Sequence, residues 1–323
     1  MYLTGFADEA AGDIEGQIRA TKALGWKYIE ARSINGKNIH DLSDKEFDLV
    51  CAKFDEAGII INCFGSAIAN HGKKIDQPFD SSIEEARRSI PRMKRMGTSL
   101  VRIMSFAVLK DRAPEDQMKE ERFKRLRILC RMFRDEGITP VHENCLCYGG
   151  MGWPYTLELL DNVPGLALVF DTGNPVVEDD YTRPAPHPKQ SSWEFYSHVR
   201  DHVAYVHIKD ARWDAERNKE VFTYPGEGDA EVSRIVKDLL SRGYDGGFSI
   251  EPHIAAVYHD PSIKTPDEAR FAVYVEYGRR MMKMIDQIQK ESCGQKLLKD
   301  FLGILPDFPE RPLQGEYEKR EIR

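Results

Sequence analysis

Acidic and histidine side chains recur where short apolar runs of this 323-residue chain end. Four successive runs end with Glu143, Asp171, His207 and Glu251. A buried carboxylate is costly unless it is paired or binds a cation, so three of them beside one imidazole indicate a metal site. Such oxygen-rich ligands suit Mn²⁺, Mg²⁺ or Co²⁺ best and also admit Zn²⁺. We therefore expect one divalent metal ion, with Mn²⁺ as the first candidate.

This set of residues indicates proton transfer next to a carbonyl. A divalent ion would bind the carbonyl and a neighbouring hydroxyl of a substrate and draw off charge as an enediolate forms. Glu143 and Glu251 are predicted to lie on opposite sides of the ion, where one removes a proton and the other returns one. Lys209 is the alternative acid or base. His142 either supports the site from behind or, if the strand breaks at Glu143, turns into it as a catalytic residue.

Further side chains are candidates for binding the substrate. Arg102 either reaches a substrate oxygen or pairs with Glu30, which is itself expected to face the substrate. Trp153 and Trp213 lie in expected loops, where an aromatic face either packs on the C–H surface of a sugar or anchors the loop. Glu227 lies between two glycines in the same expected loop as Trp213.

The apolar runs alternate with segments of helical period. The expected strands cover residues 3–7, 28–32, 59–64, 100–104, 138–143, 167–171, 203–209 and 247–252. The expected helices cover residues 13–24, 44–57, 82–96, 120–136, 155–162, 192–199, 230–242 and 267–289. Eight strand–helix units whose strands are apolar on both faces predict a parallel sheet. A closed (β/α)₈ TIM barrel needs about 250 residues, which this chain supplies. An open doubly wound sheet is disfavoured because no G-x-G-x-x-G follows the first strand.

Strand alternation predicts which side chains share a face. In a barrel of this kind the active site lies at the C-terminal ends of the strands. If His207 points inward, Tyr205 and Lys209 do so too. If Glu143 points inward, His142 and Asn144 face the helix layer while the strand stays regular.

The chain divides into a barrel over residues 1–291 and a C-terminal arm over residues 292–323. Pro306, Pro309 and Pro312 favour an extended arm over a helix. Its apolar side chains would not be stable in water unaided, so we expect the arm to pack on a partner subunit. They are Phe301, Leu302, Ile304, Leu305 and Phe308.

Composition excludes several classes of protein. The formal charge of −7 and a pI near 5.8 argue against a binder of nucleic acid or of membrane surfaces. No apolar run approaches the roughly 20 residues of a membrane span. The N-terminal residues do not have the pattern of a signal peptide, and six cysteines, several within apolar runs, indicate reduced thiols. We therefore expect a cytoplasmic protein.

The ordered motifs resemble those of the xylose isomerase-like TIM barrel superfamily, the sugar phosphate isomerase/epimerase group. The resemblance covers roughly residues 1–290. It rests on Gly5 to Glu9, Glu30, His142-Glu143-Asn144, Phe170 to Asn174, His207 to Asp210, Gly226-Glu227-Gly228 and Ile250-Glu251. The resemblance implies that Glu143, Asp171, His207 and Glu251 bind the metal, and that Glu143 and Glu251 double as acid and base.

One position departs from the pattern of the group. Many of its epimerases have a substrate-binding histidine three residues after the metal-binding aspartate, whereas this chain has Asn174. This weakens the case for a plain ketose 3-epimerase and makes Asn174 a substrate-binding candidate. The pair His142-Glu143 is also similar to that of the large subunits of C-glycoside deglycosidases, which associate with a small partner protein.

Two classes of enzyme are consistent with these residues. The leading hypothesis is an isomerase or epimerase of a sugar or keto-sugar. The alternative is a lyase at the same site, either a dehydratase or a β-eliminating subunit acting on 3-keto-C-glycosides. The superfamily also includes apurinic-site endonucleases. These need a basic surface and more metal-binding histidines, and this acidic chain shows neither. A non-catalytic sugar-binding barrel is disfavoured by the intact ligand set. We expect a small carbohydrate as substrate and an oligomeric assembly, with a small partner subunit as a further expectation.

Overall fold

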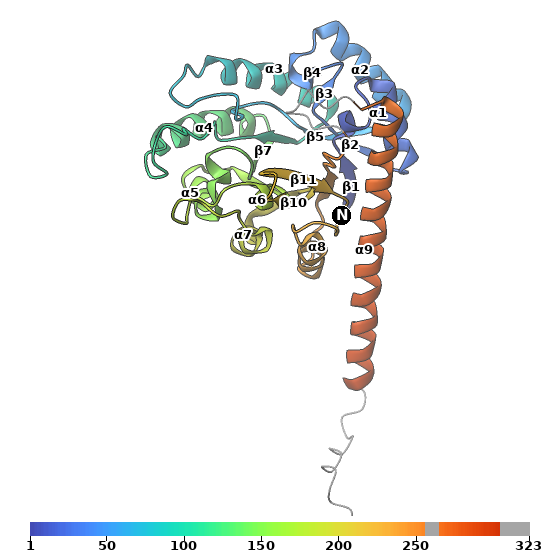
Figure 1. Ribbon diagram of the computed structural model, residues 1–323. Coiled ribbons are helices and arrows are strands. Elements are labelled where there is room, and N and C mark those ends of the chain that lie inside the picture. The colour runs from blue at the N-terminus through green and yellow to red at the C-terminus, as the bar shows by residue number, and fades with distance from the viewer. Residues whose placement is uncertain (256–264, 304–323) are drawn as a thin grey trace, which may run out of the picture.

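Parallel strands form a barrel in the computed structural model, which describes residues 1–255 and 265–303. The strands are β1 (Tyr2–Gly5), β2 (Tyr28–Ala31), β5 (Ile60–Phe64), β6 (Leu100–Ile103), β7 (Thr139–Glu143), β8 (Ala167–Asp171), β9 (Val203–Ile208) and β12 (Gly247–Ile250). They are hydrogen-bonded in the order β1-β12-β9-β8-β7-β6-β5-β2. A parallel bridge between Phe6 and Glu30 joins the two ends of this sheet (Figure 1). The predicted (β/α)₈ barrel is therefore confirmed.

Helices follow the strands and pack around the outside of the barrel. They are α1 (Ile14–Ala23), α2 (Asp44–Ala57), α3 (Asp80–Met96), α4 (Lys119–Arg134), α5 (Trp153–Asn162), α6 (Asn174–Val177), α7 (Ser192–Val199) and α8 (Val232–Ser241). Local sequence sets several of the boundaries. Ser43 and Glu46 form a reciprocal capping box at the start of α2. Gly58 and Gly97, both at φ 66°, end α2 and α3 in the left-handed conformation that glycine adopts at little cost.

The inside of the barrel is filled by side chains. Cys63, Val141, Val169 and Tyr205 come from four different strands and form a buried cluster. The outward faces of the strands pack against the helices in a much larger apolar core. The barrel is therefore closed by packing, and a ligand can approach only from the loops at its ends.

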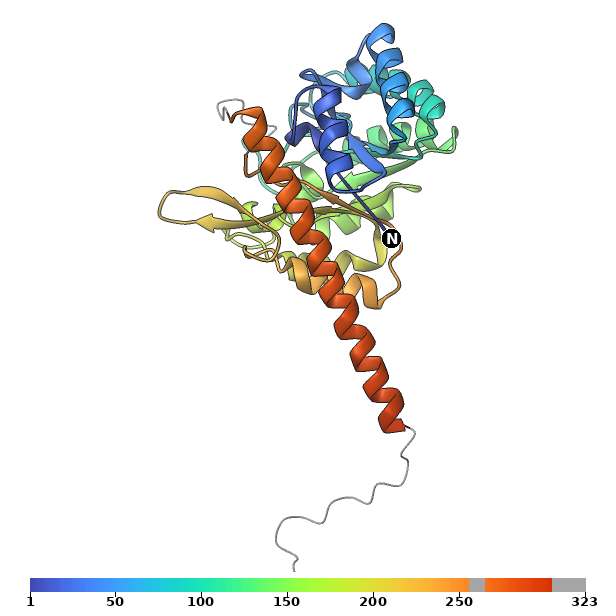
Figure 2. The ribbon, with the colours of Figure 1, turned by 90° about the vertical axis from the view of Figure 1, so that its right-hand side faces the viewer.

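The loops at the C-terminal ends of the strands carry structure that the sequence did not predict. Strands β10 (Asp210–Asp214) and β11 (Lys219–Thr223) form an antiparallel hairpin within the expected loop after β9. Figure 2 shows this hairpin, in yellow, extending away from the barrel. A smaller hairpin joins β3 (Ser33–Ile34) and β4 (Lys37–Asn38). Single-turn 3₁₀ helices are η1 (Ala7–Glu9), η2 (Ile39–Asp41), η3 (Tyr148–Met151) and η4 (Arg200–His202).

The last helix is longer than predicted. Helix α9 (Asp267–Gly303) contacts α1 and α8 and buries Tyr274, Tyr277 and Met281. Its later part extends beyond the barrel (Figures 1 and 2). The prediction of an extended arm from residue 292 is thus wrong for residues 292–303, which are rich in helix formers and precede the first proline of the tail. The rest of the predicted arm, with Pro306, Pro309 and Pro312, lies outside the described residues.

Within the described ranges, α9 and every other helix is too short or too polar to cross a lipid bilayer.

Candidate metal centre and active site

Four side chains converge at the C-terminal mouth of the barrel. Glu143 and Asp171 are the last residues of β7 and β8, His207 lies in β9, and Glu251 follows β12. These strands are neighbours in the sheet and run parallel, so their ends meet at one place. Each of the four residues offers one ligand atom, these atoms all lie within 4.8 Å of one another, and all four side chains are buried. The structure therefore brings together the residues predicted from separate strand ends.

Two buried atoms of this group test whether a cation fits. Within the described chain, His207 Nδ1 and Asp171 Oδ2 have no hydrogen-bond partner. Nδ1 lies 3.4 Å from an oxygen of Glu143, and Oδ2 lies 3.2 Å from the ammonium of Lys209. A buried polar atom that makes no hydrogen bond is costly, and a bound ion is one way to satisfy it. Three carboxylates and one imidazole are the donors that a divalent ion takes, so these residues fit the expected metal.

Glu30 lies behind His207 and sets the orientation of its ring. The two oxygens of Glu30 are 3.3 and 3.2 Å from His207 Nε2. Glu30 also accepts hydrogen bonds from the Tyr205 hydroxyl at 2.8 Å and from Ser249 Oγ at 2.6 Å. Holding Nε2 in this way turns Nδ1 toward the other ligands, as carboxylates behind metal-binding histidines commonly do. Glu30 is buried and does not line the cavity, so its predicted contact with substrate is replaced by this positioning role.

Asp171 is fixed by the backbone that follows it. Its Oδ1 accepts hydrogen bonds from the backbone N–H groups of Gly173 and Asn174 at 2.8 and 2.7 Å. The Asn144 side chain brackets the same strand end, donating to the Asp171 carbonyl and accepting from its N–H. Oδ2 is thereby directed at the centre. Asn144, which was predicted to point out of the barrel, thus uses its side-chain amide to join the end of β7 to the end of β8.

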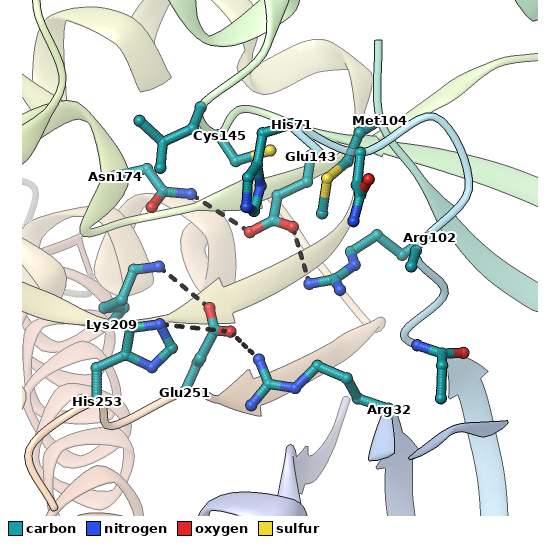
Figure 3. A pocket seen from close by; sticks show the side chains of 14 residues that line it. Arg32, His71, Arg102, Met104, Glu143, Cys145, Asn174, Lys209, Glu251 and His253 are labelled. Atoms are coloured by element: carbon teal, nitrogen blue, oxygen red, sulfur yellow. Dashed lines mark hydrogen bonds and ion pairs between the residues drawn. The ribbon is translucent and has the colours of Figure 1, made fainter. Parts of the chain in front are cut away.

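Three cations balance the carboxylates. Arg102 Nη1 lies 2.9 Å from Glu143 Oε2, and Arg32 Nη1 lies 2.6 Å from Glu251 Oε1. The ammonium of Lys209 lies 3.1 Å from Glu251 Oε2. Figure 3 shows Glu143 and Glu251 facing each other across the cleft, each with its own arginine. The Phe6 ring lies between the two guanidinium groups, 4.2 Å from that of Arg32 and 5.1 Å from that of Arg102.

Charges in this cluster shift the pKa values of its members. Burial disfavours the carboxylate of Glu143, but Arg102 and His207 outweigh it and lower its pKa to about 2. Burial raises the pKa of Asp171 to about 6, with Glu251 adding to the effect and Lys209 opposing it. Burial also disfavours the charged form of His207, yet Glu30 and Glu143 raise its pKa to about 10. Without a metal, His207 is therefore an imidazolium at neutral pH.

Lys209 and Glu251 form the other half of the cluster. Burial disfavours the carboxylate of Glu251, but Lys209, His253 and Arg32 hold its pKa well below the usual range. Burial likewise opposes the charge of Lys209, while Asp171 and Glu251 raise its pKa above the ordinary value. Glu251 is thus ionised and Lys209 protonated near neutral pH. Of the two roles predicted for Lys209, the acid fits these charges and the base does not.

A cleft, with about 590 Å³ of empty space including the part open to solvent, opens over this centre. Of the predicted residues, Arg102, Glu143, Asn174, Lys209 and Glu251 line it. Asn174 Nδ2 lies 3.3 Å from Glu143 Oε1, so the asparagine that replaces the expected histidine is at the site. The remaining lining residues are Arg32, Asn38, Ala67, Asn70, His71, Met104, Cys145, Leu146 and His253.

His142 does not reach the cleft. Its Nε2 lies 3.0 Å from Ser105 Oγ and 3.7 Å from Cys147 Sγ, on the helix side of β7. The strand stays regular through Glu143, so alternation sends the two neighbouring side chains to opposite faces. The predicted catalytic role of His142 is corrected accordingly, and its alternative place behind the site is the observed one.

The two predicted tryptophan contacts are also absent from the cleft. Trp153 opens α5 and stacks on His198 with ring centroids 3.8 Å apart. Trp213 lies on the hairpin strand β10, with the Lys189 ammonium 3.8 Å from its ring centroid. Each ring anchors one surface segment to another, which is the second of the two roles predicted for these tryptophans.

Glu227 is a surface residue in this structure. It is paired with Arg280 of α9 and does not line the cleft. The turn that carries it is held from below by Asp210, whose Oδ2 accepts the N–H groups of Gly226 and Gly228 at 2.8 and 3.1 Å. The motif around Glu227 therefore shapes the turn of the backbone, and the prediction that Glu227 binds substrate is corrected.

Sequence reasoning missed a second group of side chains beside the first. Glu9 Oε1 lies 2.8 Å from His253 Nδ1, and Glu9 Oε2 accepts the His253 backbone N–H at 2.8 Å. Glu9, Glu251 and His253 could be counted as metal ligands, but the guanidinium of Arg32 lies 3.3 Å from Glu9 and 2.6 Å from Glu251. This cation already offsets part of their charge. The sequence did offer a signal for this group, because Asp8-Glu9 and Pro252-His253 both follow strand ends.

Comparison with known proteins matches the chain to one family. A family model described as a xylose isomerase-like TIM barrel matches residues 18–273. No curated protein matches the chain by sequence.

Several solved structures share the fold at low sequence identity. A xylose isomerase-like TIM barrel protein from Mycobacterium smegmatis, solved in complex with magnesium, is 18% identical with a TM-score of 0.60, covering 84% of this chain and 88% of its own. An L-ribulose 3-epimerase is 14% identical with a TM-score of 0.64, covering 90% and 95%. The probable 3-DHS dehydratase AsbF from Bacillus anthracis is 14% identical with a TM-score of 0.64, covering 87% and 99%.

The role of Glu30 leads to a first prediction. Glu30→Gln removes the negative charge behind His207 while keeping the shape, so metal affinity should fall about 10–100-fold. The dissociation constant for Mn²⁺ can be measured by calorimetric titration. Glu227→Gln is the matched control and should leave the constant unchanged, because Glu227 lies at the surface. Equal affinities in the wild type and Glu30→Gln would show that Glu30 does not position the ligand.

The raised pKa of His207 leads to a second prediction. A proton occupies the imidazole at neutral pH, so a binding metal ion must displace it, and about one proton should be released at pH 7.5. Affinity should strengthen by roughly tenfold per pH unit from pH 7 to 9 and level off near the pKa of about 10. Below pH 6, protonation of Asp171 should weaken it further. Calorimetry in buffers of different ionisation enthalpy measures the release, and a dissociation constant independent of pH between 7 and 9 would contradict it.

Proposed function

The chain belongs to the xylose isomerase-like TIM barrel family, and from this we propose that it is a divalent-metal-dependent isomerase or epimerase of a sugar or keto-sugar. The observation that carries the proposal is the group Glu143, Asp171, His207 and Glu251, in which two buried atoms make no hydrogen bond and two members, Glu143 and Glu251, line a cleft. Mn²⁺ is the expected ion, and Mg²⁺, Co²⁺ and Zn²⁺ also suit these donors.

The protein groups around the centre suit proton transfer next to a carbonyl. A divalent ion bound here would supply Lewis-acid stabilisation of the negative charge that develops on the substrate oxygens. Glu143 and Glu251 are both ionised, so either can accept the proton from the carbon beside the carbonyl. They face the cleft from opposite sides, so the carbon is inverted when Glu143 removes its proton and Glu251, after taking up a proton from the adjacent ammonium of Lys209 or from solvent, returns one (Figure 3). Return of the proton to the neighbouring carbon gives isomerisation.

Other lining residues are placed to hold the substrate. Arg102 presents a guanidinium to the cleft while it holds Glu143, so it can also donate to a substrate hydroxyl. Asn174 offers an amide beside Glu143 at the position where many epimerases of the group have histidine. Lys209 keeps a proton close to Glu251, where it can stabilise an oxyanion or pass a proton to a departing oxygen.

A lyase acting at the same site is the second candidate, and Lys209 favours it. Elimination starts with the same removal of a proton by Glu143 or Glu251. The electron pair then expels a group from the next carbon, and that group must take up a proton as it leaves. The protonated ammonium of Lys209 lines the cleft and can supply it. A dehydratase or a 3-keto-C-glycoside deglycosidase subunit would use this step.

Carboxylate variants test the proposed chemistry. Glu143→Gln and Glu251→Gln should each slow the incorporation of solvent deuterium beside the substrate carbonyl by at least about 10²-fold, because each removes a positioned base or acid. NMR of keto-sugars incubated in D₂O with Mn²⁺-loaded protein measures the rate. Glu220→Gln, an exposed carboxylate on β11, is the control and should match the wild type.

The products separate the two candidate activities. Deuterated sugar of otherwise unchanged constitution supports the isomerase or epimerase, whereas an unsaturated sugar or a released substituent supports the lyase. Wild-type rates in both carboxylate variants, with metal still bound, would refute the proposed site.

A further inference from the structure

A second cavity, with about 810 Å³ of empty space including the part open to solvent, lies next to the cleft over the candidate metal centre. The two cavities share His71 and Leu146 in their linings. Much of the remaining wall of the second cavity is apolar, formed by Ala107, Val108, Met151, Val177 and Tyr181. Its polar residues are Lys110, Glu178, Asp179 and Lys189, with Cys147 and Gly150 completing the wall. We call it the side pocket.

The side pocket is held in shape by its own hydrogen bonds. Lys189 Nζ donates to the Val177 carbonyl at 2.7 Å and lies 2.8 Å from Asp179 Oδ1. Gln190 Nε2 donates to the carbonyls of Gly150 and Asp179 at 2.7 and 2.9 Å. These bonds tie the segment after β8 to the 3₁₀ helix η3 after β7. The walls are therefore formed before a ligand arrives, as in most small-molecule sites.

Two side chains, those of Leu146 and His71, line both the side pocket and the cleft. Leu146 is 47% exposed, which makes it one of the few large apolar side chains in the described chain left open to solvent. It follows Glu143 by three residues. His71, also exposed, lines both from the loop after β5. A ligand that spans both cavities would cover Leu146 and remove this apolar surface from water.

We propose that the side pocket binds an uncharged, apolar substituent of about the size of one aromatic ring, carried by the sugar that lies over the metal centre. The substrate is then a glycoside or a similarly substituted sugar. This rests on the proposed function for the position of the sugar and deepens it by naming the substrate class. A free pentose or hexose needs one cavity, whereas two neighbouring cavities that share His71 and Leu146 suit a two-part ligand.

The chemistry of the side pocket agrees with an uncharged ring. Val108, Met151 and Val177 offer apolar surface, and Tyr181 adds an aromatic ring. The ammonium of Lys189 is paired with Asp179, so its charge is not left over for an anionic ligand. Burial raises the pKa of Glu178 to about 8, which leaves a protonated carboxyl able to donate to a ring hydroxyl.

A binding experiment tests this substrate class without requiring turnover. Methyl and phenyl β-D-glucopyranosides carry the same sugar and cannot undergo the proposed reaction, because neither has a carbonyl. Calorimetric titration of the metal-loaded protein should give at least tenfold tighter binding of the phenyl glycoside. Val108→Trp fills the pocket from one wall and should abolish this preference while leaving the methyl glycoside within twofold of wild type. Val177→Trp fills it from the segment after β8 and should do the same.

Leu49→Trp is the control, since Leu49 is 54% exposed on α2 and lines neither cavity; it should keep the preference. Thermal unfolding checks that each variant is folded. Equal affinity of the two glycosides for the wild type, including no measurable binding of either, would overturn the proposal. A phenyl preference that survives in folded Val108→Trp and Val177→Trp would overturn it too. Loss of deuterium exchange with the phenyl preference intact would instead count against the proposed function alone.

Discussion

The balance of buried charge at the mouth of the barrel is the constraint on which the rest of the structure depends. Glu143, Asp171 and Glu251 lie almost out of contact with water, where an isolated carboxylate would be strongly disfavoured. The positively charged side chains of Arg102, Lys209 and Arg32 offset part of this cost. His207 Nδ1 and Asp171 Oδ2 still point at one place without hydrogen bonds. A divalent cation at that place would give both atoms a partner, and in this way the proposed chemistry would depend on the fold.

The barrel makes this cluster possible by bringing distant residues to one edge. Parallel strands place residues separated by more than a hundred positions within 4.8 Å, while Tyr205 and the packed interior below keep water away from the far side. Glu30 reaches across the barrel to set the ring of His207. The loops have a different task, because they form the walls of the cleft and of the side pocket and thereby select the substrate. The side chains at the strand ends and the walls formed by the loops can thus vary independently.

The fold and the convergence of the four candidate metal ligands were predictable because both follow from regular periods. Strand alternation placed His207 and Lys209 on one face and sent His142 to the other, as observed. Contacts that depend on loop paths were not predictable. Trp153, Trp213 and Glu227 were candidates because of residue type, yet each packs against a surface partner that no local pattern indicates. The role of Glu30 was missed because its partner lies 177 positions away. The length of α9 was underestimated because the prolines of the tail were taken to exclude a helix from residue 292 onward, whereas the helix continues to Gly303.

The position of a bound metal ion tests the central claim most directly. Crystals of the protein grown with Mn²⁺ should show one strong anomalous peak, at about 2.0–2.6 Å from Glu143, Asp171, Glu251 and Nδ1 of His207. Such a peak would establish that the four strand ends hold a single ion. A peak at another place, such as Glu9 and His253, or no peak at saturating Mn²⁺, would contradict it.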